Sequence, residues 1–202
     1  MKITNEDNIA LMARYPDNYF ELAIVDPPYG IGMASGAGLT RGKKKKELYA
    51  KKSWDNERPN KKYFNELFRV SENQIIWGGN YFSDLFTASR CWIYWRKLMG
   101  GNYADGELAW TSFDKNTKEF TKATVSGERI HPTQKPVKLY EWLLMNYAKE
   151  GDKILDTHLG SGSIALACHN LGFDLTACEL DEDYYNDAIK RIETHKKQIT
   201  LF

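Results

Sequence analysis

A short proline-rich turn follows an apolar run near the beginning of the chain. The run covers residues 22–25 and leads directly into Asp26-Pro27-Pro28-Tyr29. Two prolines cannot continue a β-ladder, so we expect a buried strand to end here, with Asp26 at its carboxyl end. The rigid turn then presents the Asp26 carboxylate and the Pro27 carbonyl as hydrogen-bond acceptors beside the ring of Tyr29. It suits a planar substrate with an amino group; the alternative is a stiff structural turn with a core tyrosine.

A second candidate site lies in the C-terminal part of the chain. The pattern predicts a strand over 153–156, a turn at Gly160-Ser161-Gly162, a helix over 163–171 and a strand over 175–178. Such a turn lets backbone approach a ligand at the helix N-terminus. Glu179, at the end of the second strand, can accept hydrogen bonds from both hydroxyls of a ribose. The unit favours an adenosine-bearing ligand; the alternative is a structural turn with a surface glutamate. Asp156 is either part of that site, a helix cap or a partner of Lys153.

Two polar segments complete the list of candidate functional regions. Residues 30–62 are rich in glycine and lysine, and between Arg41 and Lys52 seven basic residues stand against one acid. We interpret this segment as a long, mobile, basic loop, and the alternative is a solvated surface loop. Residues 112–130 are polar, and we expect a loop or a small hairpin there.

The elements that position these residues alternate between strands and helices. Beyond those already named, helical spacing is found over 60–70, and short apolar runs that indicate strands over 74–77, 91–95 and 107–111. Alternation of this kind predicts right-handed crossovers and a mostly parallel sheet with helices on both faces.

Composition limits the remaining classes. The chain has 202 residues, 42% hydrophobic and 27% charged, and a formal net charge of +1. We therefore expect one folded domain over 1–202, and not a polycationic protein. No stretch approaches the roughly 20 apolar residues of a membrane span. The three cysteines form no CxxC pair and the histidines show no metal-ligand spacing, so we expect no metal site and a cytoplasmic protein.

Several segments together resemble a known family, the amino-group DNA methyltransferases. The resemblance is carried by Asp26-Pro27-Pro28-Tyr29, Trp77-Gly78-Gly79-Asn80-Tyr81-Phe82, Ala104-Asp105-Gly106-Glu107-Leu108-Ala109-Trp110, His131-Pro132-Thr133-Gln134-Lys135-Pro136 and Asp156-Thr157-His158-Leu159-Gly160-Ser161-Gly162-Ser163. The acceptor turn precedes the glycine loop, so the order is similar to that of the permuted β-type, small phage-type members. The resemblance covers essentially the whole chain.

The resemblance implies a fold, a reaction and partners. The fold is a doubly wound, Rossmann-like sheet of about seven strands. The reaction moves a methyl group from S-adenosylmethionine to the N6 amino group of a flipped adenine in DNA. An aspartate rather than a serine at position 26 favours adenine over the N4 amino group of cytosine. The basic loop then supplies Lys43, Lys44, Lys45 and Lys46 for DNA phosphates, and residues 112–130 become a short target-recognition segment.

The resemblance also implies roles for single residues. The catalytic set is Asp26, Pro27, Pro28 and Tyr29. The cofactor set is Asp7, Lys135, Asp156, His158, Gly160, Ser161, Gly162, Ser163 and Glu179. Within it, Asp7 meets the cofactor's adenine, or is a solvated acid. Lys135 reaches the methionine carboxylate, or is a surface charge.

Two departures from the family's pattern leave alternatives open. The glycine loop carries Thr157-His158 where the family usually has Pro-Phe, which changes the polarity of the shelf beside the cofactor. The recognition segment is shorter than usual, so recognition depends on a short segment, on the basic loop or on the second subunit of a homodimer. The other readings are an N4-cytosine enzyme, an RNA, protein or small-molecule amino methyltransferase, a dinucleotide dehydrogenase and a catalytically silent nucleic-acid-binding module.

Overall fold

A computed structural model describes residues 1–32, 55–98, 104–124 and 129–198. Eight strands lie in these ranges: β1 (Lys2–Asn5), β2 (Phe20–Val25), β3 (Ser71–Trp77), β4 (Trp92–Arg96), β5 (Gly106–Thr111), β6 (Lys118–Thr121), β7 (Lys153–Asp156) and β8 (Asp174–Glu179). The helices are α1 (Asn8–Met12), α2 (Lys61–Val70), the short 3-10 helix η2 (Gly79–Tyr81), α3 (Val137–Tyr147), α4 (Ser163–Leu171) and α5 (Glu182–Lys196).

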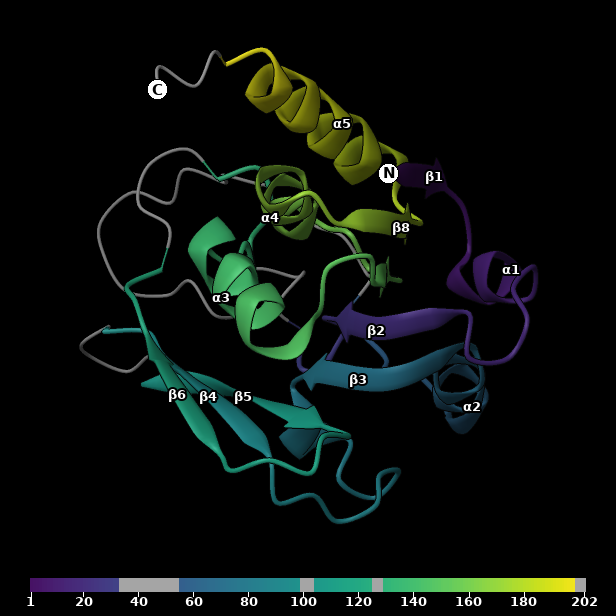
Figure 1. The fold of residues 1–202 in the computed structure, drawn as a ribbon, viewed down its shortest axis with the longest axis vertical. Coiled ribbons are helices and arrows are strands. Elements are labelled where there is room, and N and C mark those ends of the chain that lie inside the picture. Colours follow the sequence, from purple (N-terminus) through teal and green to yellow (C-terminus); the bar gives the residue numbers. More distant parts are fainter. Residues whose placement is uncertain (33–54, 99–103, 125–128, 199–202) are drawn as a thin grey trace.

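All eight strands join one sheet in the order β1-β8-β7-β2-β3-β5-β4-β6 (Figure 1). Five of the seven neighbouring pairs are parallel, and β5 is antiparallel to both β3 and β4. This confirms the expected α/β fold with a mostly parallel sheet. The described residues form eight strands, and two of them, the four-residue edge strands β1 and β6, were not among the strands expected from the sequence pattern.

The segment expected as a loop or small hairpin contains one of these edge strands. β6 pairs parallel with β4, with Ile93 opposite Lys118 and Arg96 opposite Thr121. The segment therefore extends the sheet instead of folding back on itself. The sequence shows no alternation of apolar and polar residues there, because the side chains of β6 are exposed except for Phe120, which is partly buried.

Helices cover both faces of the sheet. One core joins the sheet to α3, α4 and α5, and the other joins it to α1 and α2. The pattern of α2 explains its place, since its buried side chains Tyr63, Phe64, Leu67 and Val70 recur at helical spacing. Helix α4 ends at Gly172, whose left-handed φ of 77° is readily adopted by glycine. No helix of the described residues is both long and apolar enough to cross a bilayer.

The strand order places the candidate residues at one edge. β2, β7 and β8 are parallel neighbours, so their carboxyl ends lie at the same edge of the sheet. From β2 the chain continues to β3 on one side, and from β7 it continues to β8 on the other. Such a reversal of direction opens a crevice at the carboxyl ends of the strands. Asp26 follows β2, Asp156 ends β7 and Glu179 ends β8.

Candidate active site

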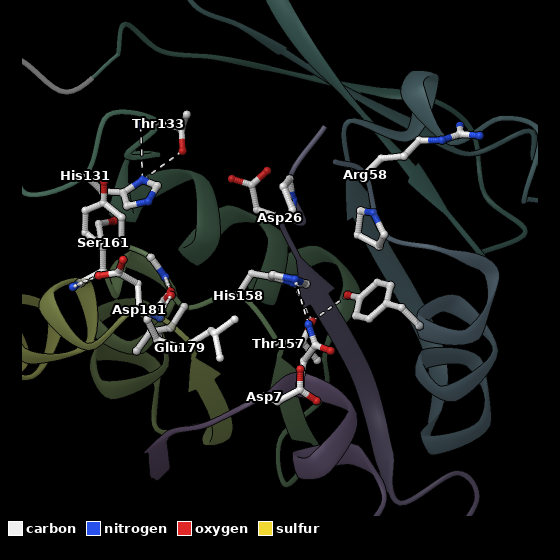
Figure 2. A pocket seen from close by; sticks show the side chains of 18 of the residues that line it. Asp7, Asp26, Arg58, His131, Thr133, Thr157, His158, Ser161, Glu179 and Asp181 are labelled. Carbon is white, nitrogen blue, oxygen red and sulfur yellow. Dashed lines mark hydrogen bonds between the residues drawn. The ribbon is translucent and has the colours of Figure 1, made fainter. Parts of the chain in front are cut away.

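A cavity of about 1100 Å³ occupies this crevice. Figure 2 shows Asp26, His158 and Glu179 around it, with Asp7 and His131 at its margins. Of the predicted site residues, the lining includes Asp7, Asp26, Pro28, Lys135, His158, Gly160, Ser161 and Glu179. The other five are Pro27, Tyr29, Asp156, Gly162 and Ser163, and each is hydrogen-bonded to, or next in sequence to, a lining residue. The tertiary structure thus gathers both candidate sites around one cavity.

The proline turn places Asp26 at the wall of the cavity. The Tyr29 hydroxyl donates to Asp26 Oδ1 over 2.6 Å, which ties the two ends of the turn together. Lys135 Nζ donates to Asp26 Oδ2 over 2.5 Å. Burial raises the pKa of Asp26, an effect that Lys135 opposes and Glu107 reinforces. Asp26 is therefore a half-buried acceptor whose charge depends on its neighbours.

The ring of Tyr29 contacts two residues of the segment after β3. Tyr81 stacks on it, with ring centroids 5.0 Å apart and planes 15° apart. Gly78 lies so close that an added Cβ would be 2.2 Å from Tyr29 Cε1. Gly78 also has a φ of 68°, in the left-handed region. Both constraints require glycine at this position.

The glycine loop is bound to the end of β8. Gly160 N donates to Glu179 Oε2 over 2.8 Å, and Asp181 N donates to Glu179 Oε1 over 3.0 Å. Gly160 and Gly162 have φ values of 51° and 71°, which explains the glycines. Burial raises the pKa of Glu179 despite these backbone donors. A carboxylate has about four acceptor positions, so the side chain can also accept hydrogen bonds from a ligand.

Helix α5 supports the loop from behind. Arg191 Nη1 donates to the Ser161 carbonyl over 2.7 Å and to Ser163 Oγ over 3.0 Å. The two serine hydroxyls are 3.1 Å apart. The ring of His131 lies across the cavity side of the loop, 3.8 Å from the position of a Cβ on Gly160. His131 in turn packs edge-on against Tyr184, with ring centroids 4.4 Å apart.

His158 is a neutral ring at the centre of the cavity wall. Its Nε2 lies 3.1 Å from Asn8 Nδ2 and its Nδ1 lies 2.9 Å from Thr157 Oγ1. An amide nitrogen only donates, so Nε2 accepts and Nδ1 carries the proton. Burial lowers the pKa of His158 to about 4, so the ring is uncharged at neutral pH. It therefore offers a flat uncharged surface where the family usually has phenylalanine.

Asp156 and Asp7 act locally on the chain. Asp156 Oδ1 accepts from the backbone N–H of His158 over 3.0 Å, and burial raises the pKa of Asp156 to about 8. Asp7 Oδ1 caps helix α1 by accepting from Ile9 N and Ala10 N. Asp7 nevertheless lines the cavity near Glu6 and Asn8.

Several residues at this site were not among the functional candidates of the sequence analysis, and Glu107, Tyr81 and Tyr63 make the most direct contacts. Glu107 contacts Lys135, Tyr81 stacks on Tyr29, and the hydroxyls of Tyr63 and Thr157 are hydrogen-bonded over 2.7 Å. Glu107 and Tyr81 stand within motifs that carry the resemblance, which was the available signal. Tyr63 gives none beyond its place on a helix face.

Lys135 lines the cavity and is not the surface charge of the alternative interpretation. The residue is only 3% exposed, and its ammonium group sits against Asp26, not against the glycine loop. Lys43, Lys44, Lys45, Lys46 and most of the basic segment 30–62 lie outside the described residues. Within the described ranges, no three acidic, histidine or cysteine side chains are grouped to hold a metal ion.

Comparison with known proteins identifies the class. The family model of the N6/N4 DNA methylases matches residues 42–190, which is more than half of the chain. The chain therefore belongs to this family of amino-group DNA methyltransferases, which modify N6 of adenine or N4 of cytosine. S-adenosylmethionine is the cofactor of the family, as the sequence resemblance implied. The acceptor turn at Asp26 lies ahead of the matched range.

Individual relatives are distant. The Type II methyltransferase M.HpaI of Haemophilus parainfluenzae is 23% identical, over 92% of this chain and 72% of its own. The putative methylase YubD of Escherichia coli K12 is 26% identical, over 92% of this chain and 87% of its own.

Solved structures share the fold. A putative DNA modification methylase from Thermus thermophilus, solved with S-adenosylmethionine, has a TM-score of 0.65 at 16% identity, covering 98% of this chain and 95% of its own. The cytosine-N4-specific PvuII methyltransferase has a TM-score of 0.63 at 13% identity, covering 99% of this chain and 87% of its own. Since enzymes of this fold include a cytosine-specific one, the fold does not fix the target base.

Proposed function

We propose that this protein methylates the N6 amino group of adenine in DNA, with Asp26 and Tyr29 receiving the base and the glycine loop holding S-adenosylmethionine. One observation carries the proposal: Asp26 and Glu179 line the same cavity, from the ends of strands β2 and β8. A base and a cofactor bound on these two sides would meet between them. The alternative within the family is the N4 amino group of cytosine.

The cofactor side fits an adenosine-bearing sulfonium. Glu179 keeps acceptor positions for the two ribose hydroxyls, and His158 supplies a neutral surface beside them. Gly160 and Ser161 bring backbone to the cavity wall, with Gly162, Ser163 and Asp156 fixing the loop from behind. Asp7 also lines the cavity, and the cofactor's adenine would lie beside it. When bound, S-adenosylmethionine supplies an electrophilic methyl group and needs no covalent enzyme intermediate.

The base side prepares the amino nitrogen. The lone pair of that nitrogen is delocalised into the ring, which makes it a poor nucleophile. Asp26 and the Pro27 carbonyl accept hydrogen bonds from its two N–H groups. These hydrogen bonds localise the lone pair and stabilise the positive charge that develops on the nitrogen. Pro28 keeps the turn rigid, and Tyr29 stacks on the base. After transfer, the methylated nitrogen releases one proton, which passes to Asp26 or to water.

The base must leave the duplex to reach this turn. In a base pair the amino group is buried in the stack, and flipping costs a few kcal/mol. In the structure Tyr81 covers a face of Tyr29, so either the base uses the other face or Tyr81 moves away when the base enters. The preference for adenine is based on the aspartate at position 26, because cytosine enzymes of this family are associated with serine at that position.

The test is methyl transfer by Asp26→Ala. We expect transfer of radiolabelled methyl groups to DNA to fall to background while cofactor binding, measured by calorimetry, stays close to that of the unmodified protein. Retained binding also shows that the variant is folded. Turnover close to that of the unmodified protein would show that the turn is structural.

The base is identified separately. DNA methylated by the unmodified protein is digested to nucleosides and analysed by mass spectrometry. N6-methyladenine supports the proposal, and N4-methylcytosine replaces it with the alternative.

A further inference from the structure

A group of four charged side chains lies beside the acceptor turn, with Lys135 buried and the other three half-buried. Lys135 Nζ is 2.5 Å from Asp26 Oδ2 and 3.0 Å from Glu107 Oε2, so one ammonium group bridges two carboxylates. Lys97 forms a second ion pair with Glu107. The two carboxylates and the two ammonium groups therefore have no net charge together when all four are ionised. We call Asp26, Glu107, Lys135 and Lys97 the charge cluster.

Aromatic rings confine the bridging ammonium group. Lys135 Nζ is 5.2 Å from the centroid of the Trp77 ring and 6.0 Å from that of Tyr29. Both distances are within the range of cation–π attraction, which is stronger away from water. The Lys135 side chain is only 2% exposed. Its charge is thus held in one place, beside the carboxylate that faces the cavity.

The charge of Asp26 matters for its proposed role. A carboxylate only accepts hydrogen bonds, whereas a protonated carboxyl group has one oxygen that donates. Burial favours the protonated form, because it removes water from the charge. Lys135 opposes this effect, while Glu107 adds to it. The other groups facing Asp26 are the hydroxyl of Tyr29 and, further away, Asp156, Tyr63 and Tyr140.

We propose that Lys135 and Glu107 are positioning residues for methyl transfer. Lys135 keeps Asp26 ionised and oriented toward the amino group. Glu107 holds Lys135 in place, because the same ammonium group also pairs with the Glu107 carboxylate. The inference rests on the proposed role of Asp26. It assigns Lys135 to the acceptor side of the cavity instead of the cofactor's methionine carboxylate, and it adds Glu107, which reaches Asp26 only through Lys135.

The charge cluster predicts opposite effects for substitutions of Lys135 and Glu107. Single-turnover transfer at saturating S-adenosylmethionine and DNA is measured against pH, and its acidic limb reports the ionisation of Asp26. Lys135→Met removes a positive neighbour, so the pKa of Asp26 rises and the limb moves to higher pH. Glu107→Gln keeps an oxygen acceptor that can hold Lys135 in place and removes only a negative charge near Asp26, so the limb moves to lower pH. An adjacent charge moves a carboxyl pKa by about one to three units, and we expect a shift of that order for Lys135→Met.

Matched controls separate this from general destabilisation. Lys138→Met removes a lysine that is close in sequence to Lys135 and pairs with Glu141. Glu66→Gln removes an acid paired with Arg69. Both controls form their ion pairs outside the charge cluster, and we expect neither to move the limb. Lys135→Arg keeps the charge and should restore the limb toward its original pH. If Lys135→Met does not fold, Glu107→Gln and Lys135→Arg still decide the matter.

The outcomes distinguish this inference from the proposed function. Opposite shifts of the limb for Lys135→Met and Glu107→Gln support it. Unshifted limbs, or shifts in the same direction, overturn it while leaving Asp26 as the acceptor if Asp26→Ala is inactive. Weaker S-adenosylmethionine binding in Lys135→Met with an unmoved limb would return Lys135 to the cofactor side. Turnover by Asp26→Ala would instead contradict the proposed function itself.

Discussion

The carboxylate of Glu179 combines a structural contact with a proposed binding role. It accepts hydrogen bonds from the backbone N–H groups of Gly160 and Asp181. Glu179 thus joins the glycine loop to Asp181, which caps the N-terminus of α5. The residue also lines the cavity, and its oxygens can accept further hydrogen bonds there. A ribose would therefore find a carboxylate already fixed in position, which lowers the entropic cost of binding.

Substitution of Glu179 tests that role. We expect Glu179→Ala to weaken S-adenosylmethionine binding by about 1.5–3 kcal/mol, the usual value of hydrogen bonds to a charged group. Glu179→Gln keeps one carbonyl acceptor and should give an intermediate loss. Titration calorimetry measures both. Unchanged affinity in a folded Glu179→Ala variant would remove Glu179 from the cofactor site.

At the scale of elements, turns at the ends of neighbouring strands support one another. β2 and β3 are parallel, with Val25 opposite Ile76, so the turns that follow them lie side by side. Gly78 and Tyr81 after β3 contact the ring of Tyr29 after β2. The geometry of the acceptor turn thus depends on a segment that belongs to another strand.

Gly78→Ala tests this dependence. The new Cβ would lie 2.2 Å from Tyr29 Cε1, so the ring has to move, and we expect a large loss of methyl transfer with cofactor affinity unchanged. Gly172→Ala is the matched control, because its φ of 77° is similar and its Cβ meets nothing within 4 Å. Both variants carry a backbone cost of about 1–2 kcal/mol in the free energy of unfolding. Equal transfer rates for the two variants would show that the position of Tyr29 is unimportant.

At the scale of the whole molecule, the sheet gathers the proposed base and cofactor sides from distant parts of the chain. The cavity lies at the carboxyl ends of β2, β7 and β8. Helices α1 and α2 cover one face of the sheet, and α3, α4 and α5 cover the other (Figure 1). A net charge of +1 gives the molecule little overall attraction for DNA. Local basic segments must then supply phosphate contacts, and the lysine-rich run is the most concentrated of them in the sequence.

The run from Lys43 to Lys46 is therefore the target of the last prediction. Replacing all four lysines by serine should weaken binding to every duplex alike, because phosphate contacts carry no sequence information. The slope of log affinity against log salt should flatten by up to about 0.9 for each lost contact. Affinity for S-adenosylmethionine should stay the same. An unchanged salt slope would mean that DNA is bound elsewhere and that the run is a solvated loop.

The local features of the site could be read from the sequence. An apolar run that ends at two prolines places Asp26 at the end of β2, and glycine spacing places the loop between β7 and α4. The sequence predicts helix α4 with its observed bounds, Ser163–Leu171, because a glycine turn precedes it and Gly172 ends it. These signals were sufficient because each depends on backbone preferences of neighbouring residues.

Only the tertiary structure decided which side chains meet. Lys135 and Asp26 are 109 positions apart, and their contact depends on how the segment before α3 crosses the carboxyl edge of the sheet. Glu107 reaches Lys135 because β5 pairs antiparallel with β3, which sets Ala109 opposite Trp77. The edge strand β6 likewise exists through its pairing with β4. Burial, and with it the pKa of Asp26, follows from this packing, so no local pattern in the sequence encodes it.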